Sequence, residues 1–274
     1  SLGICDTSNL CGALEFAEKI SKVGTQPIIG TQINFKLNDT IGLLPLFAMN
    51  ETGYKRIIEL SSLSFLKNNE LLEPHVTFEE IYKKNEGVAL FSGTVFGLFG
   101  KLFDKGKFLE IDEAYAKLKS IYEDRFYLEI QRHNDQNEIS FEKYNLKKST
   151  EFEIPLIATN EIFYINRDTH EAHDALICIK NKTYVNEKKR LRFSNHHYFK
   201  NDTEMSELFS DIPEALENNY NFPFRCNFRP LSSKPILPNI SSDKGNSADE
   251  ILKKDSLDGL NEKFKKIFNL DNKN

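Results

Sequence analysis

Histidines and cysteines are the side chains of this sequence best suited to bind a metal or to attack a substrate. His170 and His173 are three residues apart, whereas the zinc motif His-Glu-x-x-His places two imidazoles four apart on one helix face. Their spacing favours a helix surface or a supporting position behind a site. No Gly-x-Ser-x-Gly segment and no Cys-x-x-Cys pair occurs, the cysteines being Cys5, Cys11, Cys178 and Cys226. These residues alone predict no serine nucleophile, zinc ribbon or disulfide framework.

A basic and aromatic segment covers residues 188–200. Its cations are Lys188, Lys189, Arg190 and Arg192, and His-Tyr-Phe-Lys follows at 197–200. Such a segment can steer DNA by charge and stack on its bases. The favoured interpretation is a solvated loop whose aromatic rings pack back onto the fold, with DNA contact as the alternative.

Composition sets the class of protein. The chain has 274 residues, of which 39% are hydrophobic and 28% charged, enough for one large α/β domain or two small ones. A net charge of -5 argues against a surface devoted to nucleic acid, although a local basic patch is compatible with it. No apolar run approaches the ~18 residues of a membrane span. A reducing cytoplasm fits the cysteines best.

Short apolar segments alternate with helical patterns along the chain. Strands are predicted at 26–29, 43–49, 87–93, 126–131 and 155–160, and helices at 12–23, 54–61, 110–124 and 169–180. In the last helix Ala172, Leu176 and Ile179 are expected to face inward. Pro45 favours the edge or start of its strand. The alternation predicts a parallel sheet built of βαβ units, which fits either a barrel or an open sheet.

Several segments together resemble one known family. They begin with Asp6-Thr7, the run Asn-Leu-Cys-Gly-Ala-Leu-Glu-Phe at 9–16, and Pro-Ile-Ile-Gly-Thr-Gln at 27–32. Further matching segments follow in order near residues 50, 127, 158, 171, 197, 204 and 235. Over residues 2 to 270 the sequence resembles the N-terminal polymerase and histidinol phosphatase (PHP) domain of bacterial DNA polymerase III alpha subunits.

The resemblance implies a fold and a division into domains. We expect an α/β fold, a distorted (β/α)7 TIM-like barrel whose site lies at the carboxyl ends of its strands. Residues 1–240 would form a PHP domain without its first strand and His-x-His motif, so the chain is expected to be N-terminally truncated. Residues 241–250 would be a linker. Residues 251–274 would form the first helix of a following palm domain, with an apolar stripe at Leu257, Leu260, Phe264, Ile267 and Phe268.

The family's metal site is expected to be degenerate in this sequence. Intact members resemble phosphoesterases in which His, Asp, Glu and Cys hold two or three metal ions. Thr7 follows Asp6 where the family has histidine, and neutral or apolar residues stand at three further positions, Gln32, Leu43 and Phe163. Only His133 and Glu161 remain good ligands, so we expect no catalytic residues and no bound metal cluster.

The implied function is that of a scaffold. The resemblance points to a parent polymerase that uses Mg²⁺ held by palm aspartates beyond Asn274. The expected partners are the rest of the alpha chain, the proofreading exonuclease subunit and other holoenzyme subunits, with DNA bound through the parent chain and no membrane contact. The alternative is a metal-dependent phosphoesterase or 3'-exonuclease with a surviving PHP site.

Overall fold

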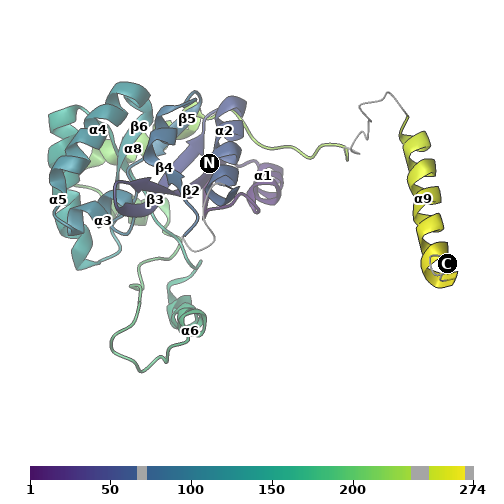
Figure 1. Ribbon diagram of the computed structural model, residues 1–274. Coiled ribbons are helices and arrows are strands. Elements are labelled where there is room, and N and C mark those ends of the chain that lie inside the picture. The colour runs from purple at the N-terminus through teal and green to yellow at the C-terminus, as the bar shows by residue number, and fades with distance from the viewer. Residues whose placement is uncertain (67–72, 236–246, 269–274) are drawn as a thin grey trace. The chain divides into compact units, whose positions relative to one another are not determined.

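The computed structural model describes residues 1–66, 73–235 and 247–268 (Figure 1). The chain divides into two compact units, Ser1–Leu231 and Ser232–Asn274. The first unit contains a curled sheet with its helices, and the second contains helix α9 (Ala248–Phe268). None of the helices in the described ranges combines the length and the apolar character that crossing a bilayer requires.

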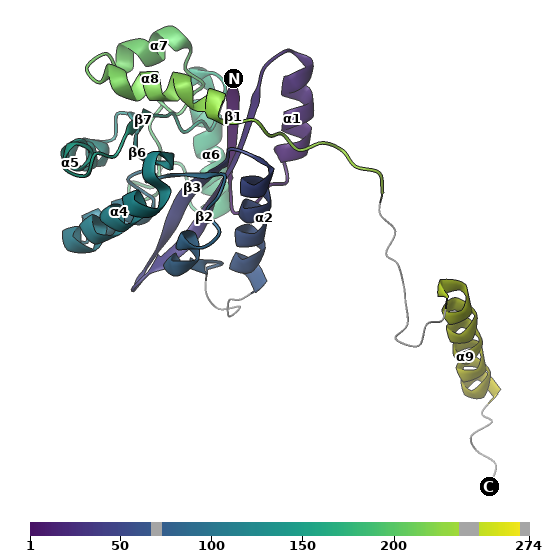
Figure 2. The same ribbon diagram turned by 90° about the horizontal axis from the view of Figure 1, so that it is seen from above.

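The sheet confirms the predicted α/β class and the barrel-like curl (Figure 2). Its described strands are β1 (Leu2–Thr7), β2 (Pro27–Leu37), β3 (Thr40–Ala48), β4 (Val76–Thr77), β5 (Val88–Phe91), β6 (Phe126–Ile130) and β7 (Leu156–Ala158). They follow the order β1-β2-β3-β5-β6-β7, with β4 beside β2. The pairs β1–β2, β2–β4, β5–β6 and β6–β7 are parallel, as the alternation of strands and helices predicts.

Strand β3 departs from the expected parallel sheet because it is antiparallel to both β2 and β5. A two-residue turn joins Leu37 to Thr40, and Asn38 in that turn has φ +52°, a conformation that asparagine tolerates. Pro45 lies inside β3 rather than at its start. It is opposite Gln32, one residue before the part of β3 that pairs with β5. A residue without an N–H is therefore tolerated there.

Helices cover the sheet and close its main core. In the first unit they are α1 (Ala13–Lys22), α2 (Glu51–Leu66), α3 (Leu98–Asp104), α4 (Phe108–Tyr122), α5 (Gln136–Phe152), α6 (His170–Asn181), α7 (Asp202–Leu208) and α8 (Pro213–Asn221). The predicted helices at 12–23, 110–124 and 169–180 are thereby confirmed. Leu44 and Leu90 of the sheet are fully buried in one cluster with Phe99 of α3 and Tyr115 of α4, and this burial is the main source of stability.

An aromatic segment fills the end of the sheet at which the parallel strands begin. Phe222, in the 3-10 turn η4 (Phe222–Arg225), packs on Phe91 and Tyr127 with ring centroids 5.3 and 5.8 Å away. Gln26, just before β2, donates a side-chain hydrogen bond of 2.7 Å to the carbonyl oxygen of Cys226. The carboxyl ends of the strands lie at the other end of the sheet.

The orientation predicted for α6 is wrong. Leu176 and Ile179 are 61% and 75% exposed, and Ala172 is exposed with them. The buried side chains of the helix are Asp174 and Cys178. The physical reason is that α6 packs through a charged pair and aromatic rings, described below, instead of through its aliphatic stripe.

In the second unit the structure describes residues 232–235 and 247–268, and its helix lies in the second of these ranges. Residues 241–246 of the predicted linker, like 236–240, lie outside the described residues, and α9 begins at Ala248, within the range assigned to that linker. The predicted apolar stripe of α9 is exposed along its length, at Leu257, Leu260, Phe264, Ile267 and Phe268. Its assignment to a palm domain stays a prediction.

Candidate functional site

The seven positions predicted from the sequence lie in strands of the sheet or just after them. They are Asp6 and Thr7 at the end of β1, Gln32 in β2, Leu43 in β3, His133 after β6, and Glu161 and Phe163 after β7. Gln32 hydrogen-bonds the carboxyl group of Glu161, whose backbone N–H lies 3.2 Å from His133 Nε2. Thr7 pairs with Gln32 through the β1–β2 ladder. Leu43 is half-buried and offers only a hydrocarbon side chain.

His133 is held by protein groups on both sides of its ring. The ring is 1% exposed, and Nδ1 lies 2.9 Å from Glu138 Oε1. Its Nε2 lies 3.1 Å from Asn160 Oδ1, in addition to the Glu161 N–H. Glu138 also accepts from the His133 backbone N–H at 2.7 Å and forms the capping box of α5 with Asp135. A metal could bind this imidazole only by displacing one of these contacts.

Glu129 is an acid that the sequence prediction did not place in the site. It lies within β6, where the hydroxyl of Thr159 and the amide of Gln131 donate to its Oε1. Its Oε2 is buried without a hydrogen-bond partner among the described residues. Burial raises the pKa of Glu129 to about 7, and the charge of Glu161 adds to this shift. The signal in the sequence is an acid inside the buried run Phe-Tyr-Leu-Glu-Ile at 126–130.

Glu161 and Cys5 share this environment. Burial raises the pKa of Glu161, against the attraction of His133 and the hydrogen bond from Gln32. Burial also raises the pKa of the Cys5 thiol, and the charges of Glu129 and Glu161 contribute. The site therefore favours neutral forms of its acids, whereas a metal ligand must be deprotonated.

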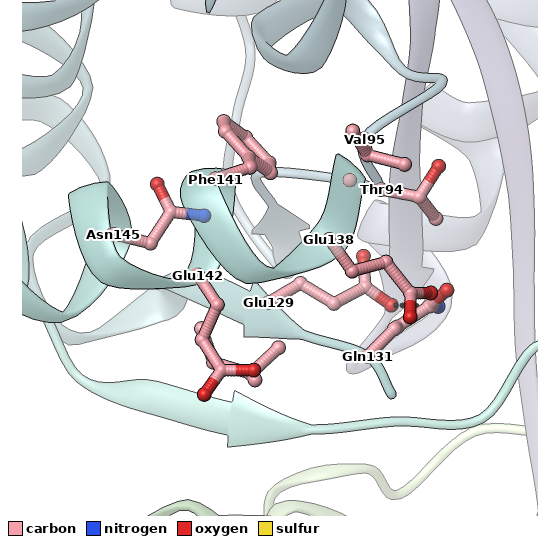
Figure 3. Close-up of a pocket in the computed structure, with 10 residues that line it drawn as sticks. Thr94, Val95, Glu129, Gln131, Glu138, Phe141, Glu142 and Asn145 are labelled. Carbon is pink, nitrogen blue, oxygen red and sulfur yellow. Dashed lines mark hydrogen bonds between the residues drawn. The ribbon is translucent and has the colours of Figure 1, made fainter. Parts of the chain in front are cut away.

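The cavity beside these acids is small. Figure 3 shows Glu129, Gln131 and Glu138 with their polar ends turned toward one another next to α5. Its volume is about 20 Å³, enough for about one water molecule. A phosphate ester does not fit into this space.

Four aromatic rings form a continuous stack next to the acids. His133 and His197 stack at 3.9 Å with an angle of 3° between their planes. Phe163 follows at 4.7 Å from His197, and His173 at 5.0 Å from Phe163. Burial lowers the pKa of His197 to about 3 and also lowers that of His173. These two imidazoles are neutral near pH 7, so the stack joins rings without a net charge at either position.

Lys200 brings a cation to the edge of this stack. Its ammonium group donates 2.8 Å to Asn160 Oδ1, the same oxygen that approaches His133, and it also donates to the carbonyl oxygen of His196. Lys200 is buried, which lowers its pKa. Neither His197 nor Lys200 was predicted as part of the site, because both come from a segment that reads as a solvated loop.

The predicted DNA-contacting cations have different surroundings. Arg190 holds both carboxylate oxygens of buried Asp174, at 2.5 and 2.6 Å, and its hydrogen bond lowers the pKa of that acid. Arg192 is largely exposed, 3.9 Å from Asp174. Lys188 and Lys189 are exposed. DNA contact by the four residues stays a prediction, and Arg190 is the least available of them.

Arg190→Ala is expected to loosen the α6 lobe, residues 165–193, because it leaves the Asp174 carboxylate buried without its partner. We expect amide hydrogen exchange in α6 and the following loop to become about ten-fold faster or more. Mass spectrometry of exchange would measure this. Arg192→Ala is the matched control, and equal effects of the two substitutions would contradict the assignment.

Comparisons with known proteins give one consistent answer. The PHP domain family matches residues 1–133. DNA polymerase III subunit alpha of Caulobacter vibrioides is 35% identical over 271 residues, which cover 94% of this chain and 23% of that protein. The same subunit of Rickettsia conorii is 38% identical over 266 residues, covering 94% and 22%. That of Borreliella burgdorferi is 31% identical over 280 residues, covering 97% and 24%.

The chain thus spans less than a quarter of the length of these curated relatives. A crystal structure from Bifidobacterium adolescentis, described as a proposed metal-dependent phosphoesterase, aligns with a TM-score of 0.37 and 12% identity, covering 58% of this chain and 75% of that chain. The family match covers residues 1–133, and the relatives cover 94–97% of the chain. Residues 1–133 therefore match the PHP domain family, and nearly the whole chain is similar to a part of DNA polymerase III alpha subunits.

Proposed function

We propose that this chain is a scaffold PHP region of a replicative DNA polymerase III alpha subunit, with a metal site that has lost its chemistry. The names and coverage of the relatives support the link to that subunit. In this role the region docks the polymerase body, the proofreading exonuclease subunit and other holoenzyme subunits in the cytoplasm. DNA synthesis would belong to the parent chain, with its Mg²⁺ held outside residues 1–274.

The aromatic stack is the observation that carries this proposal. Phe163 occupies a position where an active family member would offer a donor atom, and its ring lies between His197 and His173. Thr7 and Gln32 offer neutral oxygen atoms in place of an imidazole and a carboxylate. Several divalent ions a few ångströms apart need most of their ligands charged and convergent. The donor set present does not fit such a cluster.

The electrostatics support the same conclusion. Glu129 and Glu161 have raised pKa values. The ammonium group of Lys200 and the ring of His133 both contact Asn160 Oδ1. A cation entering this site would meet Glu129, which is partly protonated near pH 7, and a fixed ammonium group. In the ranges 1–66, 73–235 and 247–268, no three His, Cys, Asp or Glu side chains are grouped closely enough to hold an ion.

Metal analysis and an ester-hydrolysis assay test the proposal. The full chain, purified after incubation with Zn²⁺ or Mn²⁺ and desalted, is expected to retain less than about one ion per molecule. It should also hydrolyse p-nitrophenyl phosphate no faster than buffer containing the same metal. Two or more retained ions together with turnover would overturn the proposal. Glu161→Gln serves as the control, because turnover that survives this change comes from a contaminating phosphatase.

The second candidate, a phosphoesterase or 3'-exonuclease, is favoured by the two good ligands that remain at the predicted positions, His133 and Glu161, because the Glu161 backbone N–H lies 3.2 Å from His133 Nε2. Imidazole and carboxylate side chains are ligands of catalytic zinc in several hydrolases. The same metal analysis separates the two functions, because one tightly held ion with turnover lost in Glu161→Gln would favour the enzyme.

A further inference from the structure

The outer face of α6 is an aliphatic surface fixed in the exposed orientation. Ala172, Leu176 and Ile179 fall at positions i, i+4 and i+7 of the helix and are exposed, the spacing that normally faces a core. We call these three residues the α6 strip. Val185, in the loop after the helix, is 59% exposed as well. A contiguous exposed apolar face is a candidate contact surface.

The opposite face of α6 holds the helix in this orientation. Asp174 is paired with Arg190 through both oxygens, and each side chain is only 5–6% exposed. The ring of His170 lies with Nε2 2.9 Å from the carbonyl oxygen of Phe193, and Cys178 is buried. Turning the strip inward would break the ion pair and expose these groups. The strip is therefore presented outward by the fold itself.

The segment that carries the α6 strip has a net positive charge. The α6 lobe, residues 165–193, contains seven Lys and Arg against four Asp and Glu, in a chain whose net charge is -5. Four of these cations, Lys180, Lys182, Lys188 and Lys189, are exposed and form no ion pair with any residue that the structure describes. The lobe stands away from the sheet in Figure 1. It therefore offers an apolar strip within a net positive segment, a pattern complementary to an acidic, amphipathic partner.

We propose that the α6 strip docks a protein segment that carries aliphatic side chains flanked by carboxylates. Helical segments bind such surfaces through anchors at i, i+3 or i+4, and i+7. Nucleic acid is a poorer match, because phosphates and bases are bound by cations and aromatic rings, whereas this surface is aliphatic at its centre. The inference rests on the proposed docking function and names the surface that performs it.

A designed peptide tests the chemistry of the strip. The probe is a fluorescein-labelled helical peptide of about 16 residues, with Leu at i, i+3 and i+7 positions and Glu beside them, titrated with the full chain by fluorescence anisotropy. A second peptide has Lys in place of every Glu. We expect the Glu peptide to bind at least about ten-fold more tightly than the Lys peptide.

Paired substitutions locate the binding. The double variant Leu176→Asp and Ile179→Asp is expected to weaken binding of the Glu peptide at least about ten-fold. The matched control is Val23→Asp with Leu109→Asp, which changes two side chains, 75% and 79% exposed, elsewhere on the first unit. The control should bind within about two-fold of the wild type. Thermal unfolding of both double variants near the midpoint temperature of the wild type would show that neither has lost its fold.

Other results would overturn the assignment. It fails if the α6-strip variant binds the Glu peptide like the wild type, or if the Lys peptide binds equally well. The assignment also fails if the strip substitutions abolish a dimer of this chain, because a second copy would then cover the strip. It fails likewise if they abolish binding to a DNA duplex, because DNA would then be the ligand of the strip. Assembly with the cognate exonuclease subunit separates this inference from the proposed function. If the wild type and the strip variant both assemble with the exonuclease subunit, only the assignment of the strip is overturned. If the wild type binds the Glu peptide but does not assemble with the exonuclease subunit, only the proposed function is overturned.

Discussion

Replacing His133 with alanine is expected to lower the free energy of unfolding by about 2–4 kcal/mol, equally in metal-free buffer and with added Zn²⁺ or Mn²⁺. The ring is buried, and it loses a hydrogen bond to the Glu138 carboxylate worth about 1.5–3 kcal/mol. Stacking on His197 adds about 0.5–1.5 kcal/mol. Urea unfolding followed by circular dichroism, with and without a chelator, would measure the change.

His196→Ala is the control for this experiment, because it removes a neighbouring imidazole that is outside the stack. It should cost much less than the His133 substitution. A contradictory outcome is a His133→Ala cost that appears only when Zn²⁺ or Mn²⁺ is present. That result would identify the imidazole as a metal ligand, whereas a metal-independent cost identifies it as the tie between β6, α5 and the segment after β7.

Local sequence predicts the elements of this fold well and their directions less well. The apolar run bounded by Gly87 and Gly93 contains β5, and the helix that stops before Gly24 is α1. The direction of β3 depends on the short turn at Asn38. This turn contains no glycine, the residue that usually marks a hairpin. The outward face of α6 depends on the Asp174–Arg190 pair, which joins residues 16 apart and leaves no periodic signal.

The candidate site divides in the same way. Its positions along β1, β2 and the ends of β6 and β7 follow from the family resemblance and from the parallel strands. The participation of His197 and Lys200 does not, because they reach the site from a loop after α6 whose path is set by tertiary contacts such as the Phe163 N–H to His197 carbonyl bond of 2.9 Å. Glu129 could have been found from its buried strand alone.

Together the contacts describe a site held together by stacked rings, hydrogen bonds and one lysine. Ions in an active PHP site would tie the ends of several strands together through their ligands. In this chain the stack of His133, His197 and Phe163 joins β6, β7 and the loop after α6 instead. If the metal site is degenerate as proposed, these side chains keep a structural task at the ends of the strands.

Glu129→Gln is expected to remove most of the loss of stability that the wild type shows as pH rises through neutrality. Burial raises the pKa of Glu129 from its usual 4.5 to about 7 in the folded protein. The folded state thus holds the proton more tightly than the unfolded chain, and the stabilisation is complete below pH 4.5. It is lost as pH rises through about 7, by about 3 kcal/mol in all.

The neutral amide introduced by Glu129→Gln has no such titration and can still accept from Thr159 and Gln131. Urea unfolding from pH 5 to pH 8.5 should therefore show similar stabilities at the acidic end and a more stable variant at the alkaline end. The pKa of Glu161 is also raised. In both proteins it therefore adds a fall of the free energy of unfolding with rising pH. Glu15→Gln, which changes an exposed ion pair with Lys19, should alter the profile little. A difference between variant and wild type that stays constant with pH would mean that Glu129 is ionised in the folded protein, and the neutral character assigned to the site would then be wrong.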